Sequence, residues 1–316
     1  MKLIRFLPII IVIMLLFCAC SNIRVQDTSN TAGAGKVKIV TSFYPMYIFT
    51  INIAKNIEGV NVVNMAEPKS GCLHDYQMTP ADMKLIEDAD IMVINGAGME
   101  SFLDKITKEL PDLKIVEASK DLELLEEEEH PHEAEGEDVD HTNHEHSVNA
   151  HIWVSISGAI DEVRNIGEQL ANADPDNAEK YRSNTSEYVQ KLENQKEKMI
   201  KALEGIENKN IVTFHEAFPY FAEEFGLNIV ATIQSEEGSE PSAGELADTI
   251  RKIKESNVKA LFTEPQNSSN AVEIVSRETG LDVYVLDPVV SGDEDDLDAY
   301  KNAMDENLRV LVEALK

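Results

Sequence analysis

The feature that most constrains this fold is a long segment without glycine or proline in its interior, which separates two series of alternating strands and helices. Asp174-Pro175 suits the start of a helix, as N-cap and first helical residue, and Gly205 suits its end. A single apolar stripe follows the segment at helical spacing: Tyr181, Tyr188, Leu192, Met199 and Leu203. About thirty helical residues span about 45 Å. We therefore predict a long rigid linking helix, with coiled-coil dimerisation as the alternative.

The two flanking series predict two α/β lobes with mainly parallel sheets, because strand and helix patterns alternate in both. We expect an N-terminal lobe over residues 36–173, the linking helix over 174–205 and a C-terminal lobe over 206–316. Strands are expected at Val37–Thr41, Val60–Met65, Asp90–Ile94, Lys114–Val116, Asn210–Phe214, Asn228–Ile233, Val258–Thr263 and Asp282–Leu286. Thr79, Pro80 and Asp82 predict a capping box at one helix start. Other helices are expected from Glu100, Glu216 and Asp293 onwards.

The N-terminus is typical of a signal peptide. Lys2 and Arg5 precede an apolar run over residues 6–17 that is too short for a good membrane span. The following Phe17–Cys20 segment resembles the lipobox of bacterial lipoproteins. That resemblance implies that residues 1–19 are removed, that Cys20 carries a lipid, and that residues 20–35 are a flexible tether. We expect a membrane-anchored protein on the extracytoplasmic face, extracellular or periplasmic, with a secreted protein without lipid as the alternative.

The charge of the chain excludes several partners. There are 58 acidic and 28 basic residues, which gives a formal net charge of -30. Nucleic acids and anionic membrane surfaces both require a basic footprint, so neither is expected to bind the chain directly. The excess of carboxylates suits a protein that attracts cations, although solubility alone would also account for it.

The eight histidines fall into two groups. Five lie in the acidic segment over residues 121–149: His130, His132, His141, His144 and His146. We interpret this segment as a long mobile loop with an auxiliary, modest affinity for metal ions, because a disordered tract must become ordered to bind. A solvated acidic insertion is the alternative.

The other three histidines stand alone, and each lies near the end of an expected strand or loop. His74 lies after the second strand, His151 ends the acidic segment, His215 follows the fifth strand, and Asp287 follows the last. Ligands of open α/β sheets bind beyond the carboxyl ends of strands. A cleft between the halves could therefore bring these four together, and three imidazoles with one carboxylate suit a four-coordinate Zn²⁺ ion. The alternatives are hydrogen-bonded histidines and an ordinary Asp287-Pro288 turn. Glu264, after another strand, is either a fifth polar contributor or the start of a loop.

Five short segments together resemble the zinc/manganese-type metal-binding lipoproteins, the solute-binding proteins of bacterial ABC uptake systems. They are Cys72–Tyr76 with Thr79-Pro80, Asn149–Trp153, Phe214–Phe218, Phe262–Gln266 and Leu286–Pro288. The resemblance implies two α/β lobes joined by a long helix, with the metal ion between them and His74, His151, His215 and Asp287 as ligands. A histidine at the third position resembles the zinc branch. Gln77-Met78 and Asn149-Ala150 depart from the family pattern, which leaves Mn²⁺ or Fe²⁺ open as cargo and water as a substitute for Asp287.

The function implied by this resemblance is capture of Zn²⁺ outside the membrane for a high-affinity ABC importer. The expected partners are the permease and its ATPase, and the expected state is a monomer. Four protein ligands close the coordination shell, which suits binding and not catalysis, so no enzymatic activity is expected. A secreted zinc hydrolase is the alternative from another class, but Pro219 stands where the second histidine of HExxH would be. A third possibility is a surface protein that buffers metal through its histidine tract alone.

Overall fold

The computed structural model describes residues 37–66, 73, 76–126, 148–233, 241–265 and 270–316. Residues 37–316 form one compact unit, to which the following description is confined. The predicted signal peptide, the predicted lipid attachment site Cys20 and the predicted tether all lie outside the described residues. Within the described part of the chain, no helix is both long and apolar enough to cross a membrane.

Two four-stranded parallel sheets repeat the same strand order. The first consists of β1 (Val37–Thr41), β2 (Val60–Asn64), β3 (Ile91–Ile94) and β4 (Lys114–Glu117), in the order β2-β1-β3-β4. The second consists of β5 (Asn210–Thr213), β6 (Asn228–Thr232), β7 (Ala260–Thr263) and β8 (Val283–Val285), in the order β6-β5-β7-β8. The α/β class and the parallel pairing predicted from the sequence are confirmed. The buried strand β3 is apolar throughout and the buried strand β7 is apolar except for its last residue, Thr263, as expected for strands covered on both faces.

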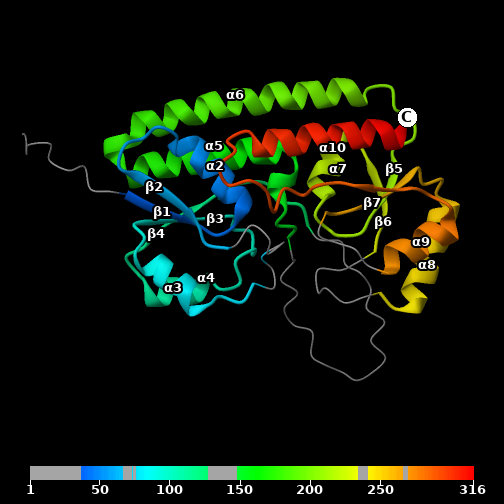
Figure 1. The fold of residues 1–316 in the computed structure, drawn as a ribbon, viewed down its shortest axis with the longest axis horizontal. Coiled ribbons are helices and arrows are strands. Elements are labelled where there is room, and N and C mark those ends of the chain that lie inside the picture. The colour runs from blue at the N-terminus through cyan, green and yellow to red at the C-terminus, as the bar shows by residue number, and fades with distance from the viewer. Residues whose placement is uncertain (1–36, 67–72, 74–75, 127–147, 234–240, 266–269) are drawn as a thin grey trace, which may run out of the picture. The chain divides into compact units, whose positions relative to one another are not determined.

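Helices connect the strands within each half (Figure 1). The first half contains α2 (Tyr44–Ala54), α3 (Pro80–Glu87), α4 (Leu103–Glu109), the short helix η1 (Ile152–Val154) and α5 (Ile156–Ala173). The second contains α7 (Pro219–Phe225), α8 (Ala243–Glu255), α9 (Asn270–Thr279) and α10 (Ala299–Leu315). The capping box predicted at Thr79 is present, because the Thr79 hydroxyl accepts from the Asp82 N–H and the Asp82 carboxylate accepts from the Thr79 N–H.

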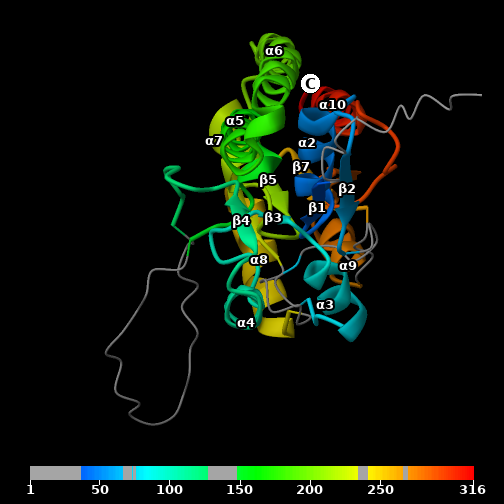
Figure 2. The ribbon, with the colours of Figure 1, turned by 90° about the vertical axis from the view of Figure 1, so that its left-hand side faces the viewer.

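The long linking helix is α6 (Ala178–Leu203), with 26 residues. A 3₁₀ turn, η2 (Pro175–Asn177), precedes it where the sequence predicted the first helical turn. The predicted apolar stripe from Tyr181 to Leu203 is buried. Figures 1 and 2 show α6 beside α10, and it also packs on α5 and α2. The stripe is therefore used inside one chain, which removes the reason to expect a coiled-coil dimer.

One hydrophobic core extends through both halves. It contains Ile39 and Val93 from the first sheet, Phe262 from the second, and the apolar stripe of α6. A smaller cluster on the second sheet joins Val212 and other strand residues to α8 and α9. Because burial of shared apolar surface opposes separation of the halves, the linkage between them is stiff.

Asp305 joins α10 to α6 on the outer side of this core. Its carboxylate accepts hydrogen bonds from Lys198 and from Gln195 (2.9 Å) on α6, and from Lys301 (3.1 Å) within α10. Although burial acts in the opposite direction, these bonds lower the pKa of Asp305 to about 2. The side chain therefore stays ionised across the physiological range and holds the two long helices together.

Three further helices begin later than the sequence predicted, because polar side chains or a proline fix the preceding turns. Glu100 does not begin α4, since its buried carboxylate accepts from the Asn95 and Gly96 N–H groups and closes a loop. Pro219 sets the start of α7. Before α10, aspartates at 293 and 296 accept from backbone N–H groups two residues on, which favours turns over helix.

Candidate metal site

His151 lies immediately before η1 and is completely buried. Its ring packs beside Trp153, with ring centres 5.2 Å apart. The Trp153 indole N–H donates to the Pro288 carbonyl oxygen at 2.8 Å. One buried indole thus connects His151, in the first half, to the turn that contains Asp287, in the second.

His215 lies two residues beyond the end of β5, and Glu264 directly follows the neighbouring strand β7. The His215 Nδ1 atom lies 2.9 Å from Glu264 Oε1, and both side chains are largely buried. Where the Glu264 oxygen accepts from a neutral imidazole, Nδ1 carries the proton and Nε2 carries the lone pair. A carboxylate behind a histidine in this way orients the ring and increases its basicity toward a metal ion.

The two histidine rings, one from each half, lie edge to face. Their centres are 5.3 Å apart and their planes are at 89°. Two imidazoles that bind one tetrahedral zinc ion through Zn–N bonds of about 2.0–2.1 Å have ring centres about 5 Å apart. The separation of His151 and His215 therefore fits a shared metal ion.

Asp287 is held rigidly in a turn after β8. Its backbone N–H and carbonyl each form a 2.8 Å hydrogen bond with the Asn307 side chain of α10, and its carboxylate accepts from the Val289 N–H at 2.7 Å. Burial raises the pKa of Asp287, the Val289 bond lowers it, and the charge of Glu264 raises it further. A carboxyl group under this repulsion is well placed to gain from a bound cation.

The structure brings together part of the predicted ligand set. His151 and His215 are adjacent, and Asp287 interacts electrostatically with the carboxylate behind His215. His74 and the five histidines of the acidic segment lie outside the described residues. Among the residues that are described, no group of three or more His, Cys, Asp or Glu side chains is arranged to hold a metal ion. The four-residue site therefore stays a prediction.

Sequence reasoning did not predict the roles of two residues that orient the histidines. Glu264 was considered only as a polar contributor or a loop start, yet it contacts the His215 ring. Asn149 was considered only as a departure from a family pattern, yet its side chain contacts His151. Only the positions of these residues in the sequence could have indicated their roles. Glu264 follows a central strand, and Asn149 lies two residues before the lone His151.

Comparisons with known proteins cover almost the whole described chain. The family model of ZnuA, described as zinc-uptake complex component A, periplasmic, matches residues 39–314. The chain is 34% identical over 306 residues to the high-affinity zinc uptake system protein ZnuA of Bacillus subtilis, covering 95% of this chain and 94% of that protein. It is 31% identical over 307 residues to the zinc-binding lipoprotein AdcA of Streptococcus pneumoniae. That match covers 94% of this chain but only 58% of AdcA.

Solved structures show the same arrangement. Zn(II)-bound AdcA from Streptococcus pneumoniae matches with a TM-score of 0.72 and 29% identity, over 89% of this chain and 58% of AdcA. The SBP FpvC from Pseudomonas aeruginosa in complex with Mn²⁺ matches with a TM-score of 0.75 and 29% identity, over 89% of this chain and 98% of FpvC. The similarity thus includes both sheets and the linking helix.

Proposed function

Because this chain belongs to the ZnuA family of zinc-uptake components, we propose that it is the extracytoplasmic zinc-binding component of a high-affinity ABC importer. The observation that carries the proposal is the pair of histidines, the buried His151 and the largely buried His215, whose Nδ1 atoms both face acceptor oxygens. That arrangement directs two Nε2 lone pairs to metal binding.

The proposed ligands of the zinc ion are His74, His151, His215 and Asp287. The first is included because it matches the family pattern, and the last because its crowded carboxyl group would gain from a cation. Three imidazoles favour Zn²⁺ over Mn²⁺, which prefers oxygen ligands. The similarity to a Mn²⁺-bound protein is the observation that favours Mn²⁺ as the second candidate cargo. Fe²⁺ is a further alternative cargo.

The proposed partners are the permease and ATPase of the importer. The match to a lipoprotein supports an extracytoplasmic position at the membrane, with Cys20 as the proposed lipid attachment site. We further propose that the chain acts as a monomer and has no enzymatic activity, since its family consists of solute-binding proteins and a closed coordination shell leaves no position for a reacting water.

Capture and release follow from the geometry. The acidic surface raises the local concentration of cations, and neutral imidazoles then bind the ion. Acid should weaken capture, because a protonated imidazole has no lone pair to donate. Since both halves share one core, opening is expected to be small, and the permease is expected to displace the loops that carry the ligands.

Replacing Glu264 by alanine is expected to weaken zinc binding about 10- to 100-fold, the usual cost of losing an outer partner of a metal-bound histidine. Glu264→Gln should lose less, because the amide oxygen can still accept from His215 Nδ1. Competition with a chromophoric chelator measures both affinities. Equal binding by wild type and Glu264→Ala would show that the carboxylate does not support the site.

The decisive experiment counts zinc ions in the chain that starts at Ser21, with and without residues 127–147. Glu126 and Val148 form an antiparallel bridge, so their Cα atoms lie about 4.5–5.5 Å apart and a short glycine-containing turn can join them. Calorimetry and mass spectrometry are expected to find one tight zinc ion per chain in both proteins, resistant to excess Mn²⁺.

Other results would change the proposal in defined ways. Loss of tight binding on deletion would place the essential ligands in the deleted segment. Preference for Mn²⁺ in a site that depends on Asp287 would change the cargo and keep the transport role. If neither protein holds a tight ion, the proposed zinc-binding function is wrong.

A further inference from the structure

Asn149 fixes the orientation of the His151 ring. Its Oδ1 atom accepts the His151 backbone N–H at 3.0 Å and lies 3.2 Å from His151 Nδ1. Because a backbone N–H can only donate, the atom facing it must be the amide oxygen, and that oxygen can only accept. Nδ1 therefore carries the proton, and Nε2 is the nitrogen with the lone pair. Both residues are buried, so water does not compete for these contacts.

The same asparagine is bonded to the segment that carries the other histidine. Its side-chain amide donates to the Glu216 carbonyl oxygen at 2.9 Å, and Glu216 is the residue after His215. Its own carbonyl oxygen accepts from the Tyr220 hydroxyl at 2.9 Å. Asn149 thus connects the backbone of His151 to the backbone next to His215.

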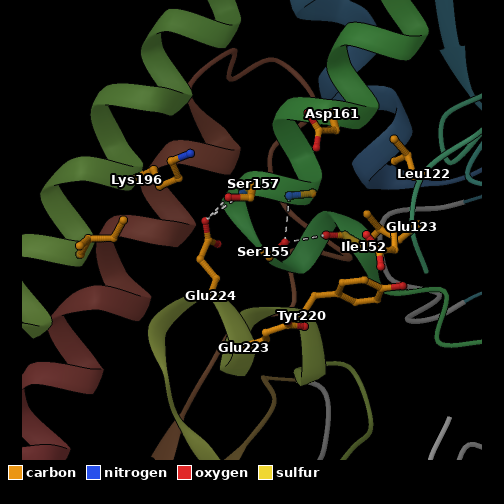
Figure 3. Close-up of a pocket in the computed structure, with 12 residues that line it drawn as sticks. Leu122, Glu123, Ile152, Ser155, Ser157, Asp161, Lys196, Tyr220, Glu223 and Glu224 are labelled. Carbon is orange, nitrogen blue, oxygen red and sulfur yellow. Dashed lines mark hydrogen bonds between the residues drawn. The ribbon is translucent and has the colours of Figure 1, made fainter. Parts of the chain in front are cut away.

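Tyr220 extends this connection to the neighbouring chain segment. Besides donating to Asn149, its hydroxyl accepts the Leu125 N–H at 2.8 Å. Leu125 is in turn bonded to Asn149, whose N–H donates to the Leu125 carbonyl at 2.8 Å. Figure 3 shows the Tyr220 ring at the side of a pocket, extending from α7 toward the segment that contains Leu122 and Glu123. One phenol from the second half therefore holds two backbone segments of the first.

We propose that Asn149 and Tyr220 are positioning residues that keep His151 and His215 in the arrangement that binds the metal ion. Asn149 selects the tautomer of His151 that binds a metal ion through Nε2. Tyr220 fixes the position of Asn149 relative to the segment that contains His215. The inference rests on the proposed zinc-binding function and adds to it two residues that touch no metal ion. It also assigns them different effects: Asn149 acts on affinity through the ring, and Tyr220 acts on the rate of release.

The test compares Asn149→Ala, Asn149→Asp and Tyr220→Phe with wild type and with Tyr181→Phe. The last variant is the matched control, since Tyr181 lies in the first turn of α6 and its hydroxyl donates to Asp174 at the end of α5, so it contacts neither Asn149 nor Tyr220. Zinc affinity is measured by chelator competition and zinc release by stopped flow into excess chelator. Nitrogen-15 spectra of the imidazoles in the metal-free protein report the tautomer of His151.

Asn149→Ala is expected to bind zinc about 10- to 100-fold more weakly and to lose the pure Nδ1–H tautomer. Asn149→Asp keeps the acceptor for His151 Nδ1 but loses the donor to the Glu216 carbonyl oxygen, so it should keep the tautomer and recover only part of the affinity. Tyr220→Phe should also keep the tautomer but release zinc about 3- to 10-fold faster, in line with the loss of one neutral hydrogen bond. Tyr181→Phe should match wild type in all three measurements.

The two proposals fail in different ways. If wild type holds no tight zinc ion, the proposed function is wrong. If wild type binds zinc and Asn149→Ala binds it equally well with an unchanged tautomer, the positioning role is wrong. Should the alanine variant fail to fold, an aspartate variant with a changed tautomer, or a Tyr220→Phe variant with unchanged zinc release, would overturn it instead.

Discussion

Replacing His215 by alanine is expected to weaken zinc binding by more than about 100-fold, beyond the range seen for outer partners of metal-bound histidines. The substitution removes a proposed ligand, and it also leaves the largely buried Glu264 carboxylate without the imidazole that it contacts at 2.9 Å. An uncompensated buried charge adds its own cost. The loss should therefore appear both in zinc affinity and in the stability of the metal-free protein.

His141→Ala is the matched comparison, because it removes a histidine from the acidic segment and leaves the His151–His215 pair intact. Its affinity for the tight zinc ion should stay within about threefold of wild type, since a residue that neither binds the ion nor orients one of its ligands changes only the local cation concentration. Chelator competition on both variants decides the matter. Equal losses at the two positions would contradict the assignment of His215 to the fixed site.

Much of the fold was predictable because each strand and the linking helix have strong local signals. The buried strand Ile91–Ile94 is entirely apolar, and the stripe on α6 has helical spacing over its whole length. Helix starts were less predictable, since they depend on side chains that bond outside the helix. Glu100 has a good helical propensity, but its carboxylate accepts from two backbone N–H groups and belongs to the preceding loop.

The sequence singled out lone histidines as candidate ligands, and the structure places the rings of two of them, His151 and His215, with centres 5.3 Å apart. The site that they belong to stays a prediction. The partners of these rings depend on contacts between segments far apart in sequence, such as His215 with Glu264. No local pattern encodes such a contact. From the sequence alone, Glu264 is therefore either a polar contributor to the site or the start of a loop, and no role is predicted for the Asn149 side chain.

Glu162 presents a different problem, because it is a carboxyl group with no visible functional use. It lies on α5 and is completely buried, and neither side-chain oxygen has a hydrogen-bond partner among the residues that the structure describes. Burial raises the pKa of Glu162 well above its ordinary value, and the charges of Glu100 and Asp161 raise it further. The side chain therefore folds in its protonated form.

The protonation of Glu162 determines the direction in which the free energy of unfolding changes with pH. An unfolded glutamate releases its proton near pH 4.5, whereas the folded Glu162 keeps it to a much higher pH. Above pH 4.5 the folded state therefore binds one more proton than the unfolded state, so the free energy of unfolding must fall as pH rises. Burial also raises the pKa of Glu100 to about 7, even though hydrogen bonds to its carboxylate oppose the shift, which adds a contribution of the same sign.

Glu162→Met is therefore expected to stabilise the metal-free protein by about 1–3 kcal/mol at pH 8, because it removes two unsatisfied buried oxygens at similar volume. At pH 4.5 the gain should shrink, and Glu162→Gln should flatten the pH dependence in the same way, since it does not titrate. The exposed Glu168, on the same helix, is the control: its bond to Arg182 lowers its pKa, and because solvent screens this exposed pair, Glu168→Gln should leave the stability close to that of wild type at both pH values. Urea unfolding in the presence of a chelator at both pH values measures these differences.

A Glu162→Met variant with the pH dependence of wild type would show that Glu162 is ionised in the folded protein, and hence that a cation or water compensates its charge.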